Sequence, residues 1–321
     1  MELITADIGG THARFAIATR RDDGGIDLSS EVRLKVAEYA SLQSAFEAYA
    51  AGLGRPVPRV AGIAVAAPIA GEPLKLTNNP WVIRPDCIAE RLRVDRVTLV
   101  NDFAAVAHAV AVCGAGDFAH LAGPEGPLPD GGVISVVGPG TGLGVAALVR
   151  GQPPRVIPTE GGHIDFAPLD SLEDMILSQL RARFCRVSVE RIVSGPGLAN
   201  VHGALAAIGG SAVPARDYAA LWQDAIAGAD SLVQAALERW MLTLGSVAGD
   251  LVLAQGGNAL VLAGGLLPRV AHLLPRSGFH SRFTAKGRFE ARMAGIPIVR
   301  ITHPEPGLLG AAAACLAEIA A

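Results

Sequence analysis

The pattern of apolar and polar residues alternates between short runs typical of buried strands and longer stretches with the spacing of a helix. The short runs predict strands at residues 3–6, 14–19, 60–66, 97–100, 133–137, 145–149, 259–263 and 298–301. The helical spacing predicts helices over residues 39–52, 103–112, 171–184, 230–250 and 308–320. Because strands and helices alternate in both halves of the chain, we expect an α/β protein.

Two of the predicted helices carry a start signal. Residues 171–174, Ser-Leu-Glu-Asp, match a capping box, in which a side chain at the helix start and one three residues later satisfy the free N–H groups. Asp230 is placed to cap the long helix that follows it. The apolar face of the earlier helix is predicted to hold Leu172, Met175, Ile176, Leu180 and Phe184.

Each half of the chain begins with a strand, a glycine turn and a second strand, which is a weak internal repeat. In the first half the turn lies in the run Asp7-Ile8-Gly9-Gly10-Thr11-His12-Ala13-Arg14. Adjacent glycines let the backbone approach a ligand closely, so the Thr11 hydroxyl and nearby N–H groups can donate to phosphate oxygens. Asp7 can hold a water molecule of hydrated Mg²⁺. For this run alone, an ordinary hairpin turn is the alternative.

The second half contains the run Gly138-Pro139-Gly140-Thr141-Gly142-Leu143-Gly144 after a buried strand. Four glycines in seven residues lower the stability of a strand region, so they are expected there only if a ligand needs a backbone without side chains. The run is not a dinucleotide fingerprint, because Leu143 stands where the third glycine is required, and it lacks the G-K-[ST] of a P-loop. Two such hairpins in one chain indicate a nucleotide held from two sides.

Asn101 and Asp102 follow the predicted strand at residues 97–100. Ligands of open α/β sheets bind beyond the carboxyl ends of strands, and a carboxylate there can accept the proton of an attacking hydroxyl. The alternative, of equal weight on these residues alone, is the N-cap of the helix that begins at Phe103.

Three further groups of residues are weaker evidence for a ligand site when each is taken alone. Glu160-Gly161-Gly162-His163 and Glu190 offer side chains that bind sugar hydroxyls by charge-assisted hydrogen bonds, although a lone glutamate is usually a solvated surface residue. In Leu262-Ala263-Gly264-Gly265-Leu266 a strand meets a glycine turn. That turn either packs against an adenosine or is only a tight connection to a helix.

Composition and charge exclude several classes of protein. Hydrophobic residues make up 50% of the chain and charged residues 18%, which is typical of a globular protein with a sizeable core. A formal net charge of −3 gives no attraction to nucleic acid or to an anionic membrane, so we expect neither as a partner.

The four cysteines and the longest uncharged stretch change this picture little. Cys87, Cys113, Cys185 and Cys315 form no C-x-x-C pair, so we expect free thiols and no zinc site. Residues 251–268 lack charges, but several glycines and polar residues interrupt them, so we expect no membrane span. With no visible signal peptide, the chain is expected to be a cytoplasmic enzyme.

Taken jointly, these motifs resemble the bacterial glucokinases of the hexokinase, Hsp70 and actin superfamily over essentially the whole chain. Residues 7–11 resemble the phosphate-1 loop of that family, residues 138–144 its phosphate-2 loop and residues 262–265 its adenosine motif. The further matches are the sugar-domain pattern Leu76-Thr77-Asn78 with Trp81, the catalytic segment 101–103, the glucose-contact segments 160–166 and 190–197, and the hinge segment 306–310.

The resemblance implies a two-domain actin-like ATPase fold of the ribonuclease H-like type, with an interdomain cleft. We expect residues 1–112 plus 303–321 to form a small α/β domain and residues 113–302 to form a large α/β domain. A homodimer is what the family implies for the quaternary structure.

The implied activity is ATP-dependent phosphorylation of D-glucose to glucose 6-phosphate, with ATP and Mg²⁺ as cofactors and no direct protein ligand for the metal. Asp102 is implied as the catalytic base. The implied sugar ligands are Asn101, Asp102, Glu160, His163 and Glu190. The implied nucleotide-binding residues are Asp7, Gly9, Gly10, Thr11, Gly140, Thr141, Gly142, Gly264 and Gly265.

The sequence departs from the family pattern at one position and leaves two rivals. His12 stands where the family usually has asparagine. If its side chain faces away from the nucleotide, ATP binding is unchanged; otherwise His12 alters the affinity for ATP or its pH dependence. The first rival is a related kinase with another acceptor, such as mannose, fructose or an N-acetylated sugar. The phosphoryl donor is also left open by the sequence, with polyphosphate and ADP as alternatives to ATP. A non-catalytic sugar sensor is the second rival, but no helix-turn-helix is expected ahead of a loop that begins at Asp7. The cysteine-rich zinc motif of related kinases and repressors is absent from the sequence.

Overall fold

The computed structural model describes residues 1–67, 69, 73–76, 79–211, 213 and 216–320, and they divide into two compact units. Unit 1 comprises Met1–Asp117, Arg150–Pro158 and Thr302–Ala321, and unit 2 comprises Phe118–Val149 and Thr159–Ile301. The predicted domain boundaries after residues 112 and 302 stay a prediction.

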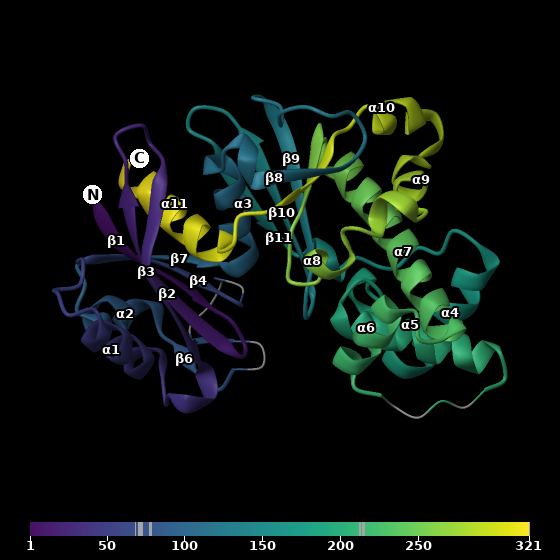
Figure 1. The fold of residues 1–321 in the computed structure, drawn as a ribbon, viewed down its shortest axis with the longest axis horizontal. Helices are drawn as coiled ribbons and strands as arrows, with labels where there is room; N and C mark the ends of the chain where they lie inside the picture. The colour runs from purple at the N-terminus through teal and green to yellow at the C-terminus, as the bar shows by residue number, and fades with distance from the viewer. Residues whose placement is uncertain (68, 70–72, 77–78, 212, 214–215, 321) are drawn as a thin grey trace. The chain divides into compact units, whose positions relative to one another are not determined.

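Unit 1 is built on a sheet in the order β3-β2-β1-β4-β7 (Figure 1). The strand β1 pairs antiparallel with β2 and parallel with β4, and β4 pairs parallel with β7. Hence the carboxyl ends of β1, β4 and β7 lie at one edge of the sheet. The bounds are β1 Glu2–Ile8, β2 His12–Arg20, β3 Ile26–Lys35, β4 Val60–Val65 and β7 Arg96–Asn101, with a separate antiparallel pair β5 Leu74–Lys75 and β6 Val82–Ile83.

Helices cover both faces of this sheet because its central strands are apolar on both sides. Ile4 and Ala6 pack on the face that also buries Phe46 of α1, whereas Leu3 packs on the other face with Cys315 of α11. The bounds are α1 Leu42–Gly52, α2 Pro85–Leu92, α3 Asp102–Val112 and α11 Pro306–Ala320.

Small residues bring α11 very close to its neighbours. A Cβ added to Gly310 would overlap the carbonyl oxygen of Ala105 in α3, and one added to Gly62 of β4 would overlap the carbonyl oxygen of Ala311. The glycines therefore allow direct backbone contact between the helix and the elements below it. This packing fixes the start of α11 near the end of β1, where the Thr5 hydroxyl donates to the Leu308 carbonyl at 2.6 Å.

Unit 2 contains a sheet in which β10, β9, β12, β13 and β8 are neighbours in that order. β12 is parallel to β9 and β13, and β8 is antiparallel to β13. The strands β9 and β10 form a hairpin whose turn is the second glycine-rich run. The bounds are β8 Phe118–Ala122, β9 Gly132–Pro139, β10 Leu143–Arg150, β12 Ala259–Leu262 and β13 Ile298–Ile301. The strand β11, Arg155–Thr159, belongs to unit 1 except for its last residue.

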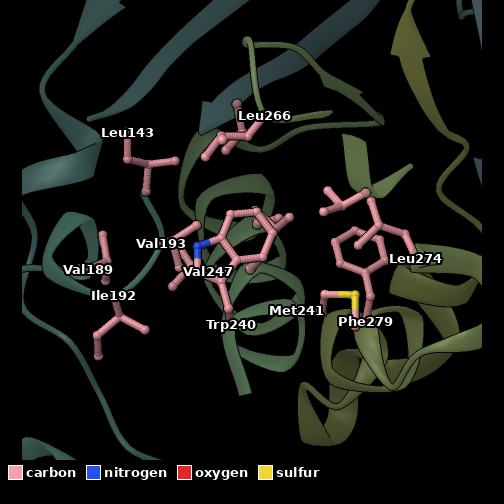
Figure 2. Close-up of a cluster of buried hydrophobic side chains, with 14 of the residues drawn as sticks. Leu143, Val189, Ile192, Val193, Trp240, Met241, Val247, Leu266, Leu274 and Phe279 are labelled. Carbon is pink, nitrogen blue, oxygen red and sulfur yellow. The ribbon is translucent and has the colours of Figure 1, made fainter. Parts of the chain in front are cut away.

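The largest core of unit 2 lies between this sheet and its helices, around the long helix α7. Trp240 and Met241 of α7 pack with Leu143 from the start of β10 and with Leu274 and Phe279 (Figure 2). The helices are α4 Ser171–Phe184, α5 Gly195–Ile208, α6 Tyr218–Ala227, α7 Ser231–Gln255, α8 Leu267–Val270, α9 Phe279–Thr284 and α10 Glu290–Ala294.

The predicted strands and long helices are confirmed, with corrections at ends and edges. The helix α4 begins at Ser171 as predicted, but its N-cap residue is Asp170 and not Ser171. The Oδ1 of Asp170 accepts from the Glu173 N–H at 2.9 Å. Met175, predicted for the buried face, is 45% exposed, and Glu173 is buried in that face instead. Tyr39 lies before α1 rather than inside it.

Five strands were missed, namely β3, β5, β6, β8 and β11, and of these β5 and β6 are only two residues long. β3 is an edge strand with mostly exposed residues, and β8 lies inside a stretch rich in glycine and proline, residues 115–132. An edge strand takes its hydrogen bonds from one neighbour only, so its sequence needs little apolar content.

Candidate active site

In unit 1, the strand register brings two of the predicted site segments to one edge of the sheet. Ile8 at the end of β1 is paired with Val65 at the end of β4, and Val65 is paired with Asn101 at the end of β7. The first glycine turn therefore leaves the sheet at the same edge as Asn101 and Asp102. This is the edge where open α/β sheets bind ligands.

The first glycine turn is a tight hairpin with its backbone toward solvent. The Gly9 N–H donates to the His12 carbonyl at 3.0 Å, and the Thr11 side of the turn is exposed. Gly10 and Thr11 thus lie at the tip of the hairpin between β1 and β2, as the sequence predicted. A turn of this kind presents bare N–H groups, which suits an anion.

Asn79 supports the turn from a distant part of unit 1. Its Nδ2 donates to the Gly9 carbonyl at 2.9 Å, and its Oδ1 accepts from the Trp81 N–H at 2.9 Å. The Trp81 indole in turn donates to the Tyr39 carbonyl at 2.9 Å. Thr77 and Asn78 of the sugar-domain pattern lie outside the described residues.

Asp7 lies at the end of β1 in a charged cluster with Arg14 and Glu305. Arg14 Nη1 is 3.1 Å from Asp7 Oδ2 and 3.3 Å from Glu305 Oε2. Burial raises the pKa of the Asp7 carboxyl, and Arg14 opposes that rise. Burial likewise raises the pKa of Glu305. The Asp7 carboxylate lies against the backbone of Gly307, since a Cβ added to Gly307 would lie 2.7 Å from Asp7 Oδ2.

Asn101 and Asp102 lie at the junction of β7 and α3. Asn101 is the N-cap of α3, with Oδ1 accepting from the Phe103 and Ala104 N–H groups at 2.9 and 3.1 Å and Nδ2 donating to the Ala67 carbonyl at 3.3 Å. Asp102 is the first residue of the helix, and its Oδ1 accepts from the Phe103 N–H at 2.8 Å. The capping alternative therefore holds for Asn101, whose amide retains one further N–H for a ligand.

In unit 2, the second glycine run forms the hairpin turn between β9 and β10. The Gly140 N–H donates to the Gly142 carbonyl at 2.8 Å, which closes the turn around Thr141. The adenosine motif packs directly beside it, because the Ala263 N–H donates to the Val137 carbonyl at 2.9 Å. Gly264, with φ of +95°, has no room for a Cβ beside the Pro139 carbonyl, and Gly265 follows it.

The start of β10 brings the predicted sugar residues to this same turn. The Leu143 N–H donates to Glu190 Oε2 at 2.9 Å. On the other side of the strand, a Cβ at Gly162 would overlap the Leu143 carbonyl, so this glycine lets the turn at residues 160–163 lie against β10. Glu160 and His163 project from that turn with 66% and 57% of their side chains exposed.

A short backbone pairing joins the two sugar segments of unit 2. The Phe166 N–H donates to the Val187 carbonyl at 3.0 Å, and the Val189 N–H donates to the Ile164 carbonyl at 2.9 Å. The Arg186 guanidinium also donates to the His163 carbonyl at 2.7 Å. Glu160, His163 and Glu190 are thus held by one framework, with His163 Nε2 4.0 Å from Glu160 Oε2.

The predicted site residues therefore form one group in each unit. Unit 1 assembles Asp7, Gly9, Gly10, Thr11, Asn101 and Asp102, and unit 2 assembles Gly140, Thr141, Gly142, Glu160, His163, Glu190, Gly264 and Gly265. Sequence reasoning missed Asn79 and Glu305, which support the first turn. The Asn-Pro pair at residues 79 and 80 is a turn signal, but nothing local in the sequence connects either residue to Gly9 or Asp7.

His12 begins β2, where it lies among cations. Arg33 Nη2 donates to His12 Nδ1 at 3.1 Å, which requires a neutral ring with its proton on Nε2. Burial lowers the pKa of His12, and the charges of Arg33, Arg14 and Lys35 lower it further. The ring therefore stays neutral above its ordinary pKa of about 6.5.

We expect His12→Asn to leave the KM for ATP within about 3-fold of the parent between pH 6.5 and 8, a change of less than one typical neutral hydrogen bond. The physical reason is that a histidine with a lowered pKa gains no proton in this range, so it adds no pH-dependent charge to the turn. Steady-state KM values for ATP across the range test this. A step in the parent profile that is missing from the variant would contradict it.

Over the described part of the chain, no group of three or more His, Cys, Asp or Glu side chains is arranged to hold a metal ion directly. All four cysteines are free thiols. None of the described helices is both long and apolar enough to cross a membrane.

Comparison with known proteins covers the whole chain. The family model described as Glucokinase matches residues 4–318. A glucokinase of Zymomonas mobilis subsp. mobilis is 56% identical over 315 residues, covering 98% of this chain and 97% of that protein. A glucokinase of Chromohalobacter salexigens is 40% identical over 310 residues, covering 96% of this chain and 95% of that protein.

Solved structures match the fold as well. A glucokinase from an Antarctic psychrotroph superposes with a TM-score of 0.87 at 34% identity, covering 98% of this chain and 99% of that one. A ROK family glucokinase from Streptomyces griseus, in complex with glucose and AMPPNP, has a TM-score of 0.62 at 20% identity, covering 97% of this chain and 98% of that one. The α/β class and the two-domain kinase fold expected from the sequence are thereby confirmed.

Proposed function

This chain belongs to the glucokinase family, and we propose the residues with which it carries out the reaction of that family. It is a phosphotransferase that moves the terminal phosphoryl group of ATP onto glucose. The assignment of residues rests mainly on the contacts made at the start of β10. There the Leu143 backbone contacts both Glu190 and the turn that bears Glu160 and His163, directly after the second glycine turn.

Asp102 is the proposed catalytic base. It accepts the proton of the sugar's primary hydroxyl as that oxygen attacks the γ-phosphorus of ATP in line, and ADP leaves with the bridging oxygen. The position of Asp102 after the carboxyl end of β7, at the same edge of the sheet as the first glycine turn, supports this role.

The remaining proposed ligands divide between sugar and nucleotide. Asn101, Glu160, His163 and Glu190 orient the sugar ring by hydrogen bonds, so that one hydroxyl faces the nucleotide. The N–H groups of the two glycine turns bind the phosphates, and the turn at Gly264 and Gly265 packs against the adenosine. The Streptomyces griseus structure holds both kinds of ligand, glucose and an ATP analogue, on the same fold.

Mg²⁺ is the proposed metal cofactor, and it would be held by ATP phosphates and water. Mg²⁺ usually keeps several waters and takes only one or two carboxylates. Asp7 fits that outer role, because it is a carboxylate at the carboxyl end of β1, directly before the first glycine turn. The metal supplies charge neutralisation for the transferring phosphoryl group. A cytoplasmic location and a homodimer are further parts of the proposal, and sedimentation of the purified protein tests the dimer.

A coupled assay across hexoses and phosphoryl donors tests the specific activity. We expect turnover with glucose and ATP, and none with 6-deoxyglucose, because that sugar lacks the accepting hydroxyl. Mannose, fructose and N-acetylglucosamine test the acceptor, whereas ADP and polyphosphate test the donor. Activity restricted to mannose, or to a donor other than ATP, would contradict the assignment of substrates while leaving the class of reaction intact.

A further inference from the structure

The segment Glu190–Gly195 is hydrogen-bonded to both ends of the second glycine turn, residues 138–144. At one end, Glu190 Oε2 accepts from the Leu143 N–H at 2.9 Å. At the other end, the Gly195 N–H donates to the Gly140 carbonyl at 2.7 Å. A short piece of chain that begins with a proposed sugar ligand thus closes a ring with the proposed phosphate-binding turn.

Glu190 fills the space that a side chain at position 142 would need. A Cβ added to Gly142 would overlap Glu190 Oε2 and lie 3.1 Å from its Cδ. By contrast, a Cβ added to Gly140 in the same turn would meet no atom within 4 Å. The absence of a side chain at Gly142 therefore leaves room for the Glu190 carboxylate, and the Leu143 N–H holds it there. The carboxylate has lone pairs left to accept from sugar hydroxyls.

Two buried tryptophans hold the Gly195 end of the segment. The Trp240 indole N–H donates to the Ser194 carbonyl at 3.1 Å, and the Trp222 indole N–H donates to the Gly195 carbonyl at 2.9 Å. Both rings are fully buried and meet edge to face at a centroid distance of 5.2 Å. In Figure 2 the Trp240 nitrogen lies on the side of Val193.

The residues between the two ends are also held rigidly. Ile192 and Val193 are buried, and their N–H groups donate to the Val189 carbonyl at 3.0 and 2.8 Å. Asn200 Nδ2 donates to the Arg191 carbonyl at 2.8 Å. A close-packed segment transmits a displacement of one end rather than absorbing it.

We infer that Glu190 is a positioning residue for the phosphate-binding turn as well as a sugar ligand, and that the segment 190–195 couples glucose binding to ATP binding. Fixing the Glu190 carboxylate on a sugar orders the Leu143 N–H and the adjoining turn. By linkage, a nucleotide on the turn then strengthens sugar binding by the same factor. The inference rests on the proposed function in one respect, the role of Glu190 as a sugar ligand.

The first test introduces a side chain into the second glycine turn and measures the Kd for glucose. Gly142→Ala displaces the Glu190 carboxylate. Because the displaced atoms are the end of a flexible side chain, the movement costs little free energy, so the fold is expected to survive. Circular dichroism of the variant checks this. Without nucleotide, the Kd for glucose should rise by roughly 10-fold, since a charge-assisted hydrogen bond is lost or misplaced. The matched variant Gly140→Ala should leave that Kd within about 2-fold, because its Cβ enters open space.

The reciprocal test substitutes Glu190 and measures the binding of the ATP analogue AMPPNP. Without sugar, Glu190→Ala should weaken binding of AMPPNP by roughly 5- to 10-fold, the loss of one hydrogen bond to the turn. Glu190→Gln should restore nucleotide binding, because its amide oxygen still accepts from the Leu143 N–H. A structural role for the glutamate that is unrelated to the turn would give no such rescue.

The outcomes separate this inference from the proposed function. If Glu190→Ala leaves the Kd for glucose unchanged, its assignment as a sugar ligand is wrong. If Glu190→Ala weakens glucose binding while Gly142→Ala does not, Glu190 remains a sugar ligand and the coupling is refuted. Equal effects of Gly142→Ala and Gly140→Ala on glucose would also refute it, because they would show a general response of the turn.

Discussion

Asp102→Asn is expected to lower kcat by roughly 10²- to 10⁴-fold, the usual cost of losing a general base. The amide has nearly the shape of the carboxylate and can still accept from the Phe103 N–H, which Asp102 Oδ1 does at 2.8 Å. It cannot take up the proton of the sugar hydroxyl at neutral pH. Hence the chemical step should fail while the helix start is preserved, and glucose binding should survive in part.

Steady-state kinetics with glucose and ATP, together with the Kd for glucose, measure this effect. Asp217→Asn is a matched control, since Asp217 is an exposed aspartate that accepts from the Ala220 N–H at the start of α6 at 3.2 Å. It should leave kcat nearly unchanged. A near-normal kcat for Asp102→Asn, or for Asp102→Ala, would show that another group takes the proton.

The second large effect is expected on stability, from Arg239→Met in α7. Arg239 Nη1 lies 2.9 Å from Glu173 Oε1 and 2.6 Å from Asp170 Oδ2, and only 14% of its side chain is exposed. Glu173 is 3% exposed, and its other oxygen accepts from the Leu169 N–H at 2.7 Å. Removing the cation leaves a buried carboxylate with Arg282 at 3.5 Å, so the free energy of unfolding should fall by about 3–5 kcal/mol.

The pKa of Asp170 shows how strongly this network stabilises the charged form of its carboxylate. Partial burial opposes the charged form, but the Glu173 N–H, Arg239 and Arg282 outweigh it and lower the pKa of Asp170 to about 2. Because that pKa is below its ordinary value, the stabilisation is present above about pH 4 and is lost as the pH falls toward 2. Urea unfolding of the parent and the variant at neutral pH is therefore the cleanest measurement of Arg239→Met.

Arg216→Met in the same unit serves as the control for that experiment. Arg216 pairs with Asp224, but 34% and 36% of the two side chains are exposed. Water screens such a pair, so its loss should cost roughly 0–1 kcal/mol. If Arg239→Met cost no more than Arg216→Met, the buried network would contribute little to the stability of unit 2.

The elements of the fold could be predicted to different extents, for physical reasons. Strands β1, β4, β9 and β12 are buried on both faces, so their sequences are mostly apolar, with Thr5 and Ser135 as buried polar exceptions. The cap of α7 at Asp230 is a local hydrogen bond to the Val233 N–H at 2.8 Å, and local bonds leave local signals. The edge strand β3 has apolar residues at the alternate positions 26, 28, 32 and 34, but most of its residues are exposed and its signal is therefore weaker than that of a buried strand.

By itself the sequence determined the α/β class, the two glycine hairpins and the candidate residues Asp102, Glu160, His163 and Glu190. Each of these depends on residue type and on spacing over a few positions. Only the tertiary structure decided what those residues contact. Asn79 meets Gly9 across 70 positions of sequence, and Glu190 meets Leu143 across 47.

Such contacts cannot be read from spacing, because strand register and helix packing decide which distant residues meet. The register of β1, β4 and β7 brings Asn101 to the edge where the first turn begins. Similarly, the buried indoles of Trp222 and Trp240 set the position of Gly195 beside the second turn. The residues proposed for the chemistry could be picked out along the chain, whereas the contacts that hold them in place exist only after the core has packed.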